Sequence, residues 1–410
     1  MYMYFNVQLR NPAPACSVTS CKCCCSESGG RAPNLKPPMP THMVLPGRLA
    51  RLAAGLALAA CGAAAEETPR ADLLEFSAIV VGGVLQHGEP VAVWGVGAQR
   101  GAAVVVTLHA QPPTTVHTVA NSGGKWSLQL PAQPVAWHVP LTALSDGAAT
   151  DTTVSFGKVV LCAGQSNMDM PVACHLTNKT ACFTPKPAFH ADNGTAEVAA
   201  AGRYADKIFM QKAINSKYKH APAWQTASSG TGFQDYPGAF SAVCWYTGKS
   251  LFEKLGSDTP VGLLQTSVGG SPIEYWLPPY QPDPPPANVN ACERDVPQCD
   301  NKFNDSFFFT DIVEQFVPYT IGALVWDQAE RDVKCPVATA AYACMQQELT
   351  TSWRKAFQSH RAPFVAVQLP GYTGALNNGT GTYPGYISAE MVFNMRLEQA
   401  AGCQNVSDAR

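Results

Sequence analysis

One apolar run in the sequence leads directly into a glycine and a serine, at Val159-Val-Leu-Cys-Ala-Gly-Gln-Ser166. A nucleophilic serine needs this arrangement, because a hydroxyl on a tight turn at a strand end lies beside the N-terminal amides of the next helix, which can receive an oxyanion. A serine at this point can also be an ordinary helix N-cap, whose side chain bonds a helix amide. From the residues alone, Ser166 is a candidate nucleophile for acyl transfer, with capping as the alternative.

Apolar runs of strand length alternate with amphipathic stretches after Gly157. The runs are 159–162, 261–264, 321–326 and 364–369, and the amphipathic stretches lie near 238–255, 307–319 and 341–357. This alternation predicts an α/β fold in which helices cover both faces of a parallel sheet. Sheets of this kind place their sites at the carboxyl ends of the strands, where Ser166 is expected.

Short β-rich runs occupy the chain from about Leu74 to Ser155. They are 91–94, 103–108, 114–119 and 125–130, and Asn121-Ser-Gly-Gly124 separates the last two, which predicts a hairpin. Strands at this spacing predict a small β-sandwich. Single histidines scattered among the strands are interpreted as ordinary surface or edge residues: His87, His109, His117 and His138.

Three segments in order along the chain resemble the conserved blocks of one enzyme family. They are Gly164-Gln-Ser-Asn-Met168 with Pro171-Val172 following, the stretch 260–276, and Val325-Trp-Asp-Gln-Ala-Glu-Arg-Asp332. Together they resemble the sialate O-acetylesterases and related plant acetyl esterases of the GDSL/SGNH hydrolase superfamily, over roughly 76–399. The resemblance implies an SGNH-hydrolase-like parallel sheet flanked by helices and preceded by the β-sandwich, with domains at 66–155 and 156–410.

The resemblance also implies roles for individual residues. Ser166 attacks an acetyl carbonyl, and its own amide with that of Gly269 or Gly270 holds the oxyanion. Gln328 matches a side-chain amide that can be the third donor, and Glu330 matches an acidic residue that orients the loop. Ordinary alternatives are a strand-end turn for the glycines and helix capping for Gln328 and Glu330. The resemblance implies no metal and no cofactor.

Two positions depart from the family pattern, and one block is missing. Asp327 replaces an aromatic residue, and Ala329 replaces a glycine whose freedom at positive φ the loop can require. The family's general base is a histidine three residues after an aspartate near the C-terminus, yet none of the nine histidines follows an aspartate at that spacing. His360, just before the run 364–369, lies at the wrong end of its strand for Ser166.

The C-terminal stretch 395–402 resembles the helix that precedes the family's Asp-x-x-His block. We therefore expect residues 1–410 to be a truncated product in which the catalytic domain, 156–410, is incomplete. We expect this chain to hydrolyse esters at near-background rates.

Composition and resemblance together limit the partners. A net charge of −2 with 14% charged residues gives no basic stripe, so no nucleic-acid partner is expected. The resemblance implies an O-acetylated sugar substrate, in the first instance an O-acetylated sialic acid. The alternatives are an acetylated plant-type polysaccharide such as acetylxylan, or an inactive homologue that binds carbohydrate.

The N-terminal region has the pattern of an export signal. Arg48 and Arg51 flank the apolar core 52–60, and Ala63-Ala64-Ala65 gives a small-residue cleavage site, so 43–65 is predicted to be a signal peptide. Residues 1–42, rich in cysteine, proline and glycine, are interpreted as a non-native or disordered extension, with a small metal-binding knuckle as the alternative. We expect a secreted, extracellular or lysosomal protein, without membrane attachment unless Cys61 is lipidated.

Nine cysteines follow the signal and can form disulfides in an exported chain. The short spacings predict loop pairs Cys174/Cys182, Cys292/Cys299 and Cys335/Cys344, and the odd total leaves one thiol over. Five Asn-x-Ser/Thr acceptors are predicted to lie in surface loops: Asn178, Asn193, Asn304, Asn378 and Asn405.

Overall fold

The computed structural model describes residues 73–172, 191–213, 223–228, 239–279, 306–370 and 389–404. The predicted extension and signal peptide lie outside these residues, as do two predicted cysteine pairs and four of the five glycosylation acceptors. Within the described part, no helix has the length and apolar character needed to cross a bilayer.

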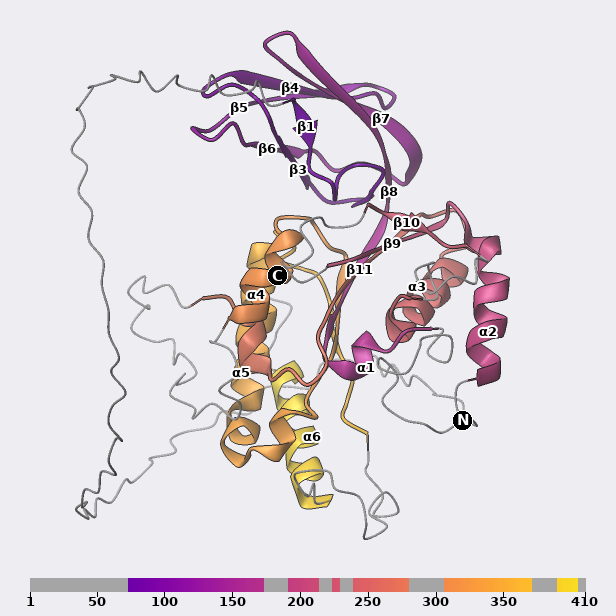
Figure 1. The fold of residues 1–410 in the computed structure, drawn as a ribbon, viewed down its shortest axis with the longest axis vertical. Helices are drawn as coiled ribbons and strands as arrows, with labels where there is room; N and C mark the ends of the chain where they lie inside the picture. The colour runs from indigo at the N-terminus through magenta and orange to yellow at the C-terminus, as the bar shows by residue number, and fades with distance from the viewer. Residues whose placement is uncertain are drawn as a thin grey trace, which may run out of the picture. The chain divides into compact units, whose positions relative to one another are not determined.

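The first strands form two sheets that share a core (Figure 1). A three-stranded antiparallel sheet contains β1 (Glu75–Phe76), β3 (Val91–Val96) and β6 (Trp126–Leu130). The second sheet contains β2 (Val84–Gln86), β4 (Ala103–Leu108), β5 (Thr114–Val119), β7 (Ala136–Ser145) and β8 (Ala148–Gly164). Alternate residues of both sheets, such as Val93 and Val106, are buried in one cluster.

The predicted hairpin at 121–124 is wrong, although a turn forms there. The Asn121 side chain accepts from the amides of Gly123 and Lys125, which fixes the turn. Strand β5 nevertheless pairs with β4, while β6 pairs with β3 in the other sheet. The alternating burial of β6 directs Trp126 and Leu128 into the shared core, so the chain changes sheets at this turn.

The long strand β8 passes through the predicted domain boundary near residue 155 and continues as the central strand of a parallel sheet. The order there is β10 (Gln225–Thr226), β9 (Ile208–Lys212), β11 (Val261–Ser267), β8, β12 (Ala323–Asp327) and β13 (Phe364–Ala366). All of these pairs are parallel except β10 with β9. The expected mixed α/β fold is confirmed.

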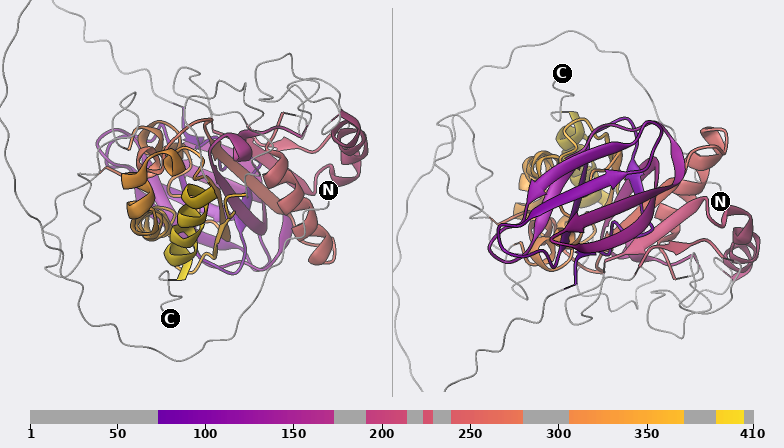
Figure 2. Two further views of the ribbon diagram at one scale, coloured as in Figure 1. Left: turned by 90° about the horizontal axis from the view of Figure 1, so that it is seen from below. Right: turned by 90° about the horizontal axis from the view of Figure 1, so that it is seen from above.

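Helices cover both faces of the parallel sheet (Figures 1 and 2). One face packs against α3 (Ala242–Lys254), and α2 (Ala191–Ala200) lies on the same side. The other face carries α4 (Phe307–Asp311), α5 (Pro336–Ala356) and α6 (Ala389–Gln404). The amphipathic stretch 307–319 is therefore a short helix followed by the 3-10 turn Val313–Gln315, and the acceptor Asn193 lies in α2 rather than in a loop.

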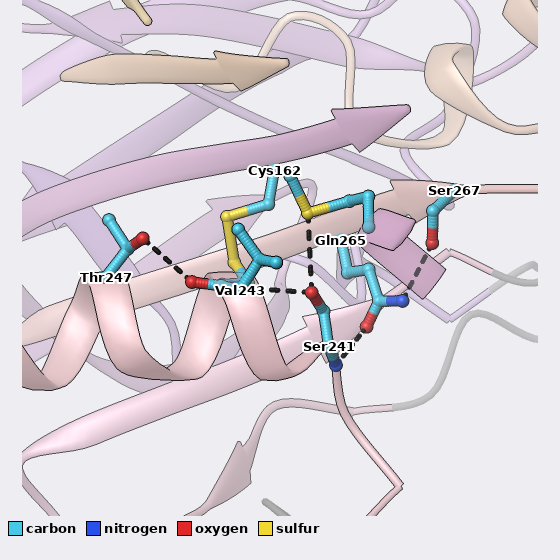
Figure 3. The surroundings of a disulfide bond; sticks show 8 residues. Cys162, Ser241, Val243, Thr247, Gln265 and Ser267 are labelled. Atoms are coloured by element: carbon cyan, nitrogen blue, oxygen red, sulfur yellow. Dashed lines mark hydrogen bonds between the residues drawn. A yellow bond between two sulfur atoms is a disulfide. The ribbon is translucent and has the colours of Figure 1, made fainter. Parts of the chain in front are cut away.

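One disulfide joins the two central elements of this fold. Cys162 in β8 is bonded to Cys244 in α3 (Figure 3). Their Cα atoms lie 5.8 Å apart, and both residues are fully buried. The predicted Cys335/Cys344 pair is wrong: both residues are disulfide-bonded, but Cys335 caps α5 and Cys344 lies nine residues further along the helix axis. That rise of about 13 Å exceeds the reach of a disulfide. Cys403 is a free thiol.

Candidate active site

Ser166 is the first residue of the four-residue helix α1 (Ser166–Asp169), directly beyond the carboxyl end of β8. Gly164 has φ +146°, and a Cβ there would lie 2.0 Å from the Asp327 carbonyl oxygen, so only glycine fits. The Gln165 amide donates to that same oxygen at 3.0 Å. The N-cap position belongs to Gln165, without a side-chain cap, so Ser166 is not the capping residue. It is half-buried on a tight turn.

The Gly269-Gly270 turn lies beside this serine turn. Ser267 at the end of β11 is in register with Gly164, and the Val268 amide donates to the Gly164 carbonyl oxygen at 3.1 Å. Gly270 has φ +75°, and both glycines are exposed. Among the residues that the structure describes, neither glycine amide has an acceptor. These amides are available to a ligand at the serine edge.

Gln328 is placed differently from the predicted oxyanion donor. Its side chain is 1% exposed, and its amide nitrogen donates to Gln165 Oε1 at 3.1 Å, to the Ser271 carbonyl oxygen at 2.9 Å and to the Asp332 carboxylate. Its oxygen accepts from the Tyr342 hydroxyl at 2.8 Å. An amide has only two N–H donors. Gln328 therefore ties together the loops after β8, β11 and β12, and it has no donor left for an oxyanion.

Glu330 lies in the same loop and contacts α1. Its carboxylate accepts from the side-chain amide of Asn167, the residue after Ser166. Burial raises the pKa of Glu330, while Asn167 and Lys334 act in the opposite direction. The contact joins α1 to the loop that follows β12.

Asp327 ends β12 beside the serine turn. Strand alternation places its side chain on the same face as Val325, which packs in one cluster with Met168 of α1. The residue is 7% exposed. Burial, with a smaller contribution from the Glu330 carboxylate, raises the pKa of Asp327 to about 7. A carboxyl group with a pKa of about 7 thus lies at the same edge of the sheet as Ser166.

Ala329 occupies the conformation for which the sequence pattern expects glycine. Its φ is +145°, and the residue is fully buried. A side chain in this region of the Ramachandran plot is strained. Hydrogen bonds of both neighbours, Gln328 and Glu330, hold the loop in which Ala329 lies.

Histidines of the described part lie away from this edge. His360 is exposed and precedes β13, which runs parallel to β12 and β8, so it stands at the amino end of the sheet. His87, His109, His117 and His138 lie in or next to the strands of the first two sheets. Within the described ranges, no group of histidine, cysteine and acidic side chains could hold a metal ion.

The sequence interpretation missed three polar residues at this edge. Asp169 ends α1, Lys212 ends β9 and Ser267 ends β11, and the three form one hydrogen-bonded group. The available signal for Lys212 and Ser267 was their position two or three residues beyond the apolar runs 208–210 and 261–264, and for Asp169 its position three residues after Ser166.

A parallel sheet covered by helices on both faces, with a serine turn at the carboxyl end of its central strand, defines an α/β protein whose candidate site lies at that edge. Residues 157–404, more than half of the chain, match the family described as "Carbohydrate esterase, sialic acid-specific acetylesterase". The chain belongs to this family, as the sequence resemblance predicted.

Curated relatives include the sialate O-acetylesterases of Rattus norvegicus and Homo sapiens. The rat protein is 27% identical over 329 residues, covering 68% of this chain and 57% of its own length. The human protein is 26% identical over 311 residues, covering 68% of this chain and 53% of its own length. The chain thus spans little more than half the length of these relatives.

A solved structure has the same fold. It is a carbohydrate acetylesterase from Xanthomonas citri, with a TM-score of 0.61 and 21% sequence identity, and the match covers 81% of this chain and 67% of that one.

Proposed function

We propose that the protein is a serine esterase that removes O-acetyl groups from sugars through an acetyl-Ser166 intermediate. The observation that carries the proposal is the position of Ser166, half-buried on a glycine-enforced turn beside the exposed Gly269-Gly270 amides. Membership of a carbohydrate esterase family supports the same chemistry.

In the proposed reaction, the Ser166 hydroxyl adds to the acetyl carbonyl while a general base takes its proton. The amides of Ser166 and of Gly269 or Gly270 stabilise the tetrahedral oxyanion. The C–O bond to the sugar breaks, and the sugar oxygen receives the proton. Water then adds to the acetyl-serine, and acetate leaves as the Ser166 hydroxyl re-forms. The histidine that would be the base is not among the residues at this edge that the structure describes.

We assign Gln328 and Glu330 to holding this arrangement rather than to the reacting atoms. Gln328 joins three loops through a saturated buried amide. Glu330 contacts the residue next to the nucleophile. We also interpret the two N-terminal sheets as a β-sandwich domain at 66–155, which shares β8 with the catalytic domain at 156–410.

O-acetylated sialic acid is the proposed substrate, because the curated relatives are named sialate O-acetylesterases. Acetylated xylan is the alternative. Release of acetate from the two substrates, each measured with the protein isolated from its host and with its Ser166→Ala variant, distinguishes them. Release from sialic acid that depends on Ser166 supports the proposal, and release from xylan alone refutes this substrate assignment. Glycan binding without acetate release points to an inactive homologue.

Secretion or residence in an extracellular or lysosomal compartment is part of the proposal. Disulfides persist mainly in oxidising compartments, and Cys162–Cys244 is a fully buried disulfide between core elements. N-terminal sequencing of the protein from its host tests the predicted cleavage before Glu66. A mature chain that retains the predicted signal peptide contradicts this part.

A further inference from the structure

A single carboxylate oxygen at the end of α1 collects three hydrogen-bond donors. Asp169 Oδ1 accepts from Lys212 Nζ at 2.8 Å, from Ser267 Oγ at 2.9 Å and from Gln265 Nε2 at 3.2 Å. Lys212 ends β9, and the other two donors lie in the last three residues of strand β11, just before the glycine pair. Asp169 therefore attaches α1 to two neighbouring strands of the parallel sheet.

Gln265 links this attachment to the start of α3. Its side chain is fully buried, its Nε2 also donates to Ser267 Oγ at 2.8 Å, and its Oε1 accepts from the Ser241 amide at 2.9 Å (Figure 3). Ser241 is the N-cap of α3, and its hydroxyl lies 3.3 Å from the sulfur of Met168. The disulfide of Cys244 then fixes the start of α3 to β8.

Each residue of α1 after the serine is thus held by a different neighbour. Asn167 is held by Glu330, Met168 by Ser241, and Asp169 by Lys212, Ser267 and Gln265. A four-residue helix cannot be stable by itself, because helix nucleation is unfavourable. Its orientation must come from these external contacts, and the one with most donors is at Asp169.

We propose that Asp169 is a positioning residue, which fixes the orientation of α1 and thereby the direction of the Ser166 hydroxyl. This inference rests on the proposed function. Asp169 lies three residues beyond the nucleophile on α1 and acts through the helix. A nucleophile displaced by about 1 Å can lose on the order of 10² in rate.

The test compares Asp169→Ala and Asp169→Asn with the wild type. The rate at which a fluorophosphonate labels Ser166 is measured by mass spectrometry over a range of probe concentrations, and amide hydrogen exchange is measured at 166–169. We expect the limiting labelling rate to fall by about 10² in Asp169→Ala, with probe affinity unchanged. The limiting labelling rate should fall less in Asp169→Asn, because the asparagine side-chain oxygen can still accept hydrogen bonds. Amide hydrogen exchange at 166–169 should be fastest in Asp169→Ala, slower in Asp169→Asn and slowest in the wild type.

Glu197→Gln is the matched control. It removes one carboxylate from a partly buried ion pair with Lys249, at 2.8 Å, which joins α2 to α3 instead of holding α1. This variant should label and exchange like the wild type. If Asp169→Ala is too unstable to measure, Asp169→Asn and Lys212→Met give the same comparison.

The outcomes separate the two proposals. Wild-type protein without a label on Ser166 refutes the proposed function, and exchange at 166–169 still decides whether Asp169 holds α1. Labelling at Ser166 with wild-type rates in every Asp169 and Lys212 variant overturns the positioning role. Equal slowing in Glu197→Gln also overturns it, because the effect is then a general loss of stability.

Discussion

Replacing Asp327 by asparagine should make the protein more stable at mildly alkaline pH. Asp327 is 7% exposed at the end of β12, and burial together with the Glu330 carboxylate raises its pKa from 3.8 to about 7. Asparagine has the same shape and no charge. The variant therefore removes the cost of holding an ionised carboxylate in this position.

The size and sign of the effect follow from the two pKa values. Between about pH 4 and pH 7 the native state binds more protons at Asp327 than the unfolded state, so wild-type stability falls as the pH rises. Each pKa unit corresponds to about 1.4 kcal/mol. The rise of the Asp327 pKa from 3.8 to about 7 therefore lowers the free energy of unfolding by about 4 kcal/mol, and this loss is complete above neutrality. Below about pH 4 both states are protonated and the cost disappears.

Urea unfolding followed by tryptophan fluorescence, at a series of pH values, measures this difference. The advantage of Asp327→Asn should be absent in acid and should grow through neutrality to at most about 4 kcal/mol. Asp146→Asn, at an exposed position, is the control and should give no such rise. A stability difference for Asp327→Asn that is independent of pH, or a variant less stable than wild type in alkali, refutes the reasoning.

Three further substitutions test the fold around the site. Ala329→Gly should stabilise the protein by about 1 kcal/mol, because the relief of backbone strain at φ +145° exceeds the cost of the greater entropy of the unfolded chain. A lower urea midpoint than that of the wild type contradicts this. Gln328→Ala should destabilise the protein by about 2–4 kcal/mol, because it removes the hydrogen bonds of a buried side chain to Gln165, Ser271 and Tyr342, and unchanged thermal unfolding would be inconsistent with the network. Replacing both Cys162 and Cys244 by alanine should cost about 4–5 kcal/mol for a disulfide that spans 82 residues, measured against the wild type with intact disulfides; a loss below about 1 kcal/mol argues against this.

Local patterns in the sequence predicted the elements that carry the site. The alternating runs 103–108 and 114–119 are strands with the predicted bounds. The apolar runs that end before Ser166, Gly269 and Gln328 are neighbouring parallel strands, so their loops meet at one edge. Period and propensity can be recognised in a short stretch of chain, and the parallel arrangement follows from the alternation of strands with amphipathic stretches.

Contacts between distant segments could not be predicted in the same way. Cys162 and Cys244 are separated by 82 residues, whereas the prediction favoured short spacings. The Asn121 turn is local, but the partner of β6 depends on how Trp126 packs against the other sheet. The direction of the Gln328 side chain depends on Gln165, Ser271 and Tyr342, which belong to three different elements.

The nucleophilic role of Ser166 is the central claim, and mapping a covalent fluorophosphonate adduct tests it most directly. Wild-type protein is incubated with the probe, digested and analysed by tandem mass spectrometry, and Ser166→Ala is treated in parallel. The proposal predicts a single adduct on Ser166, none on Ser267 or Ser271 at the same edge, and no adduct in the variant, which keeps the wild-type melting temperature. An adduct on another serine that persists in Ser166→Ala contradicts the assignment.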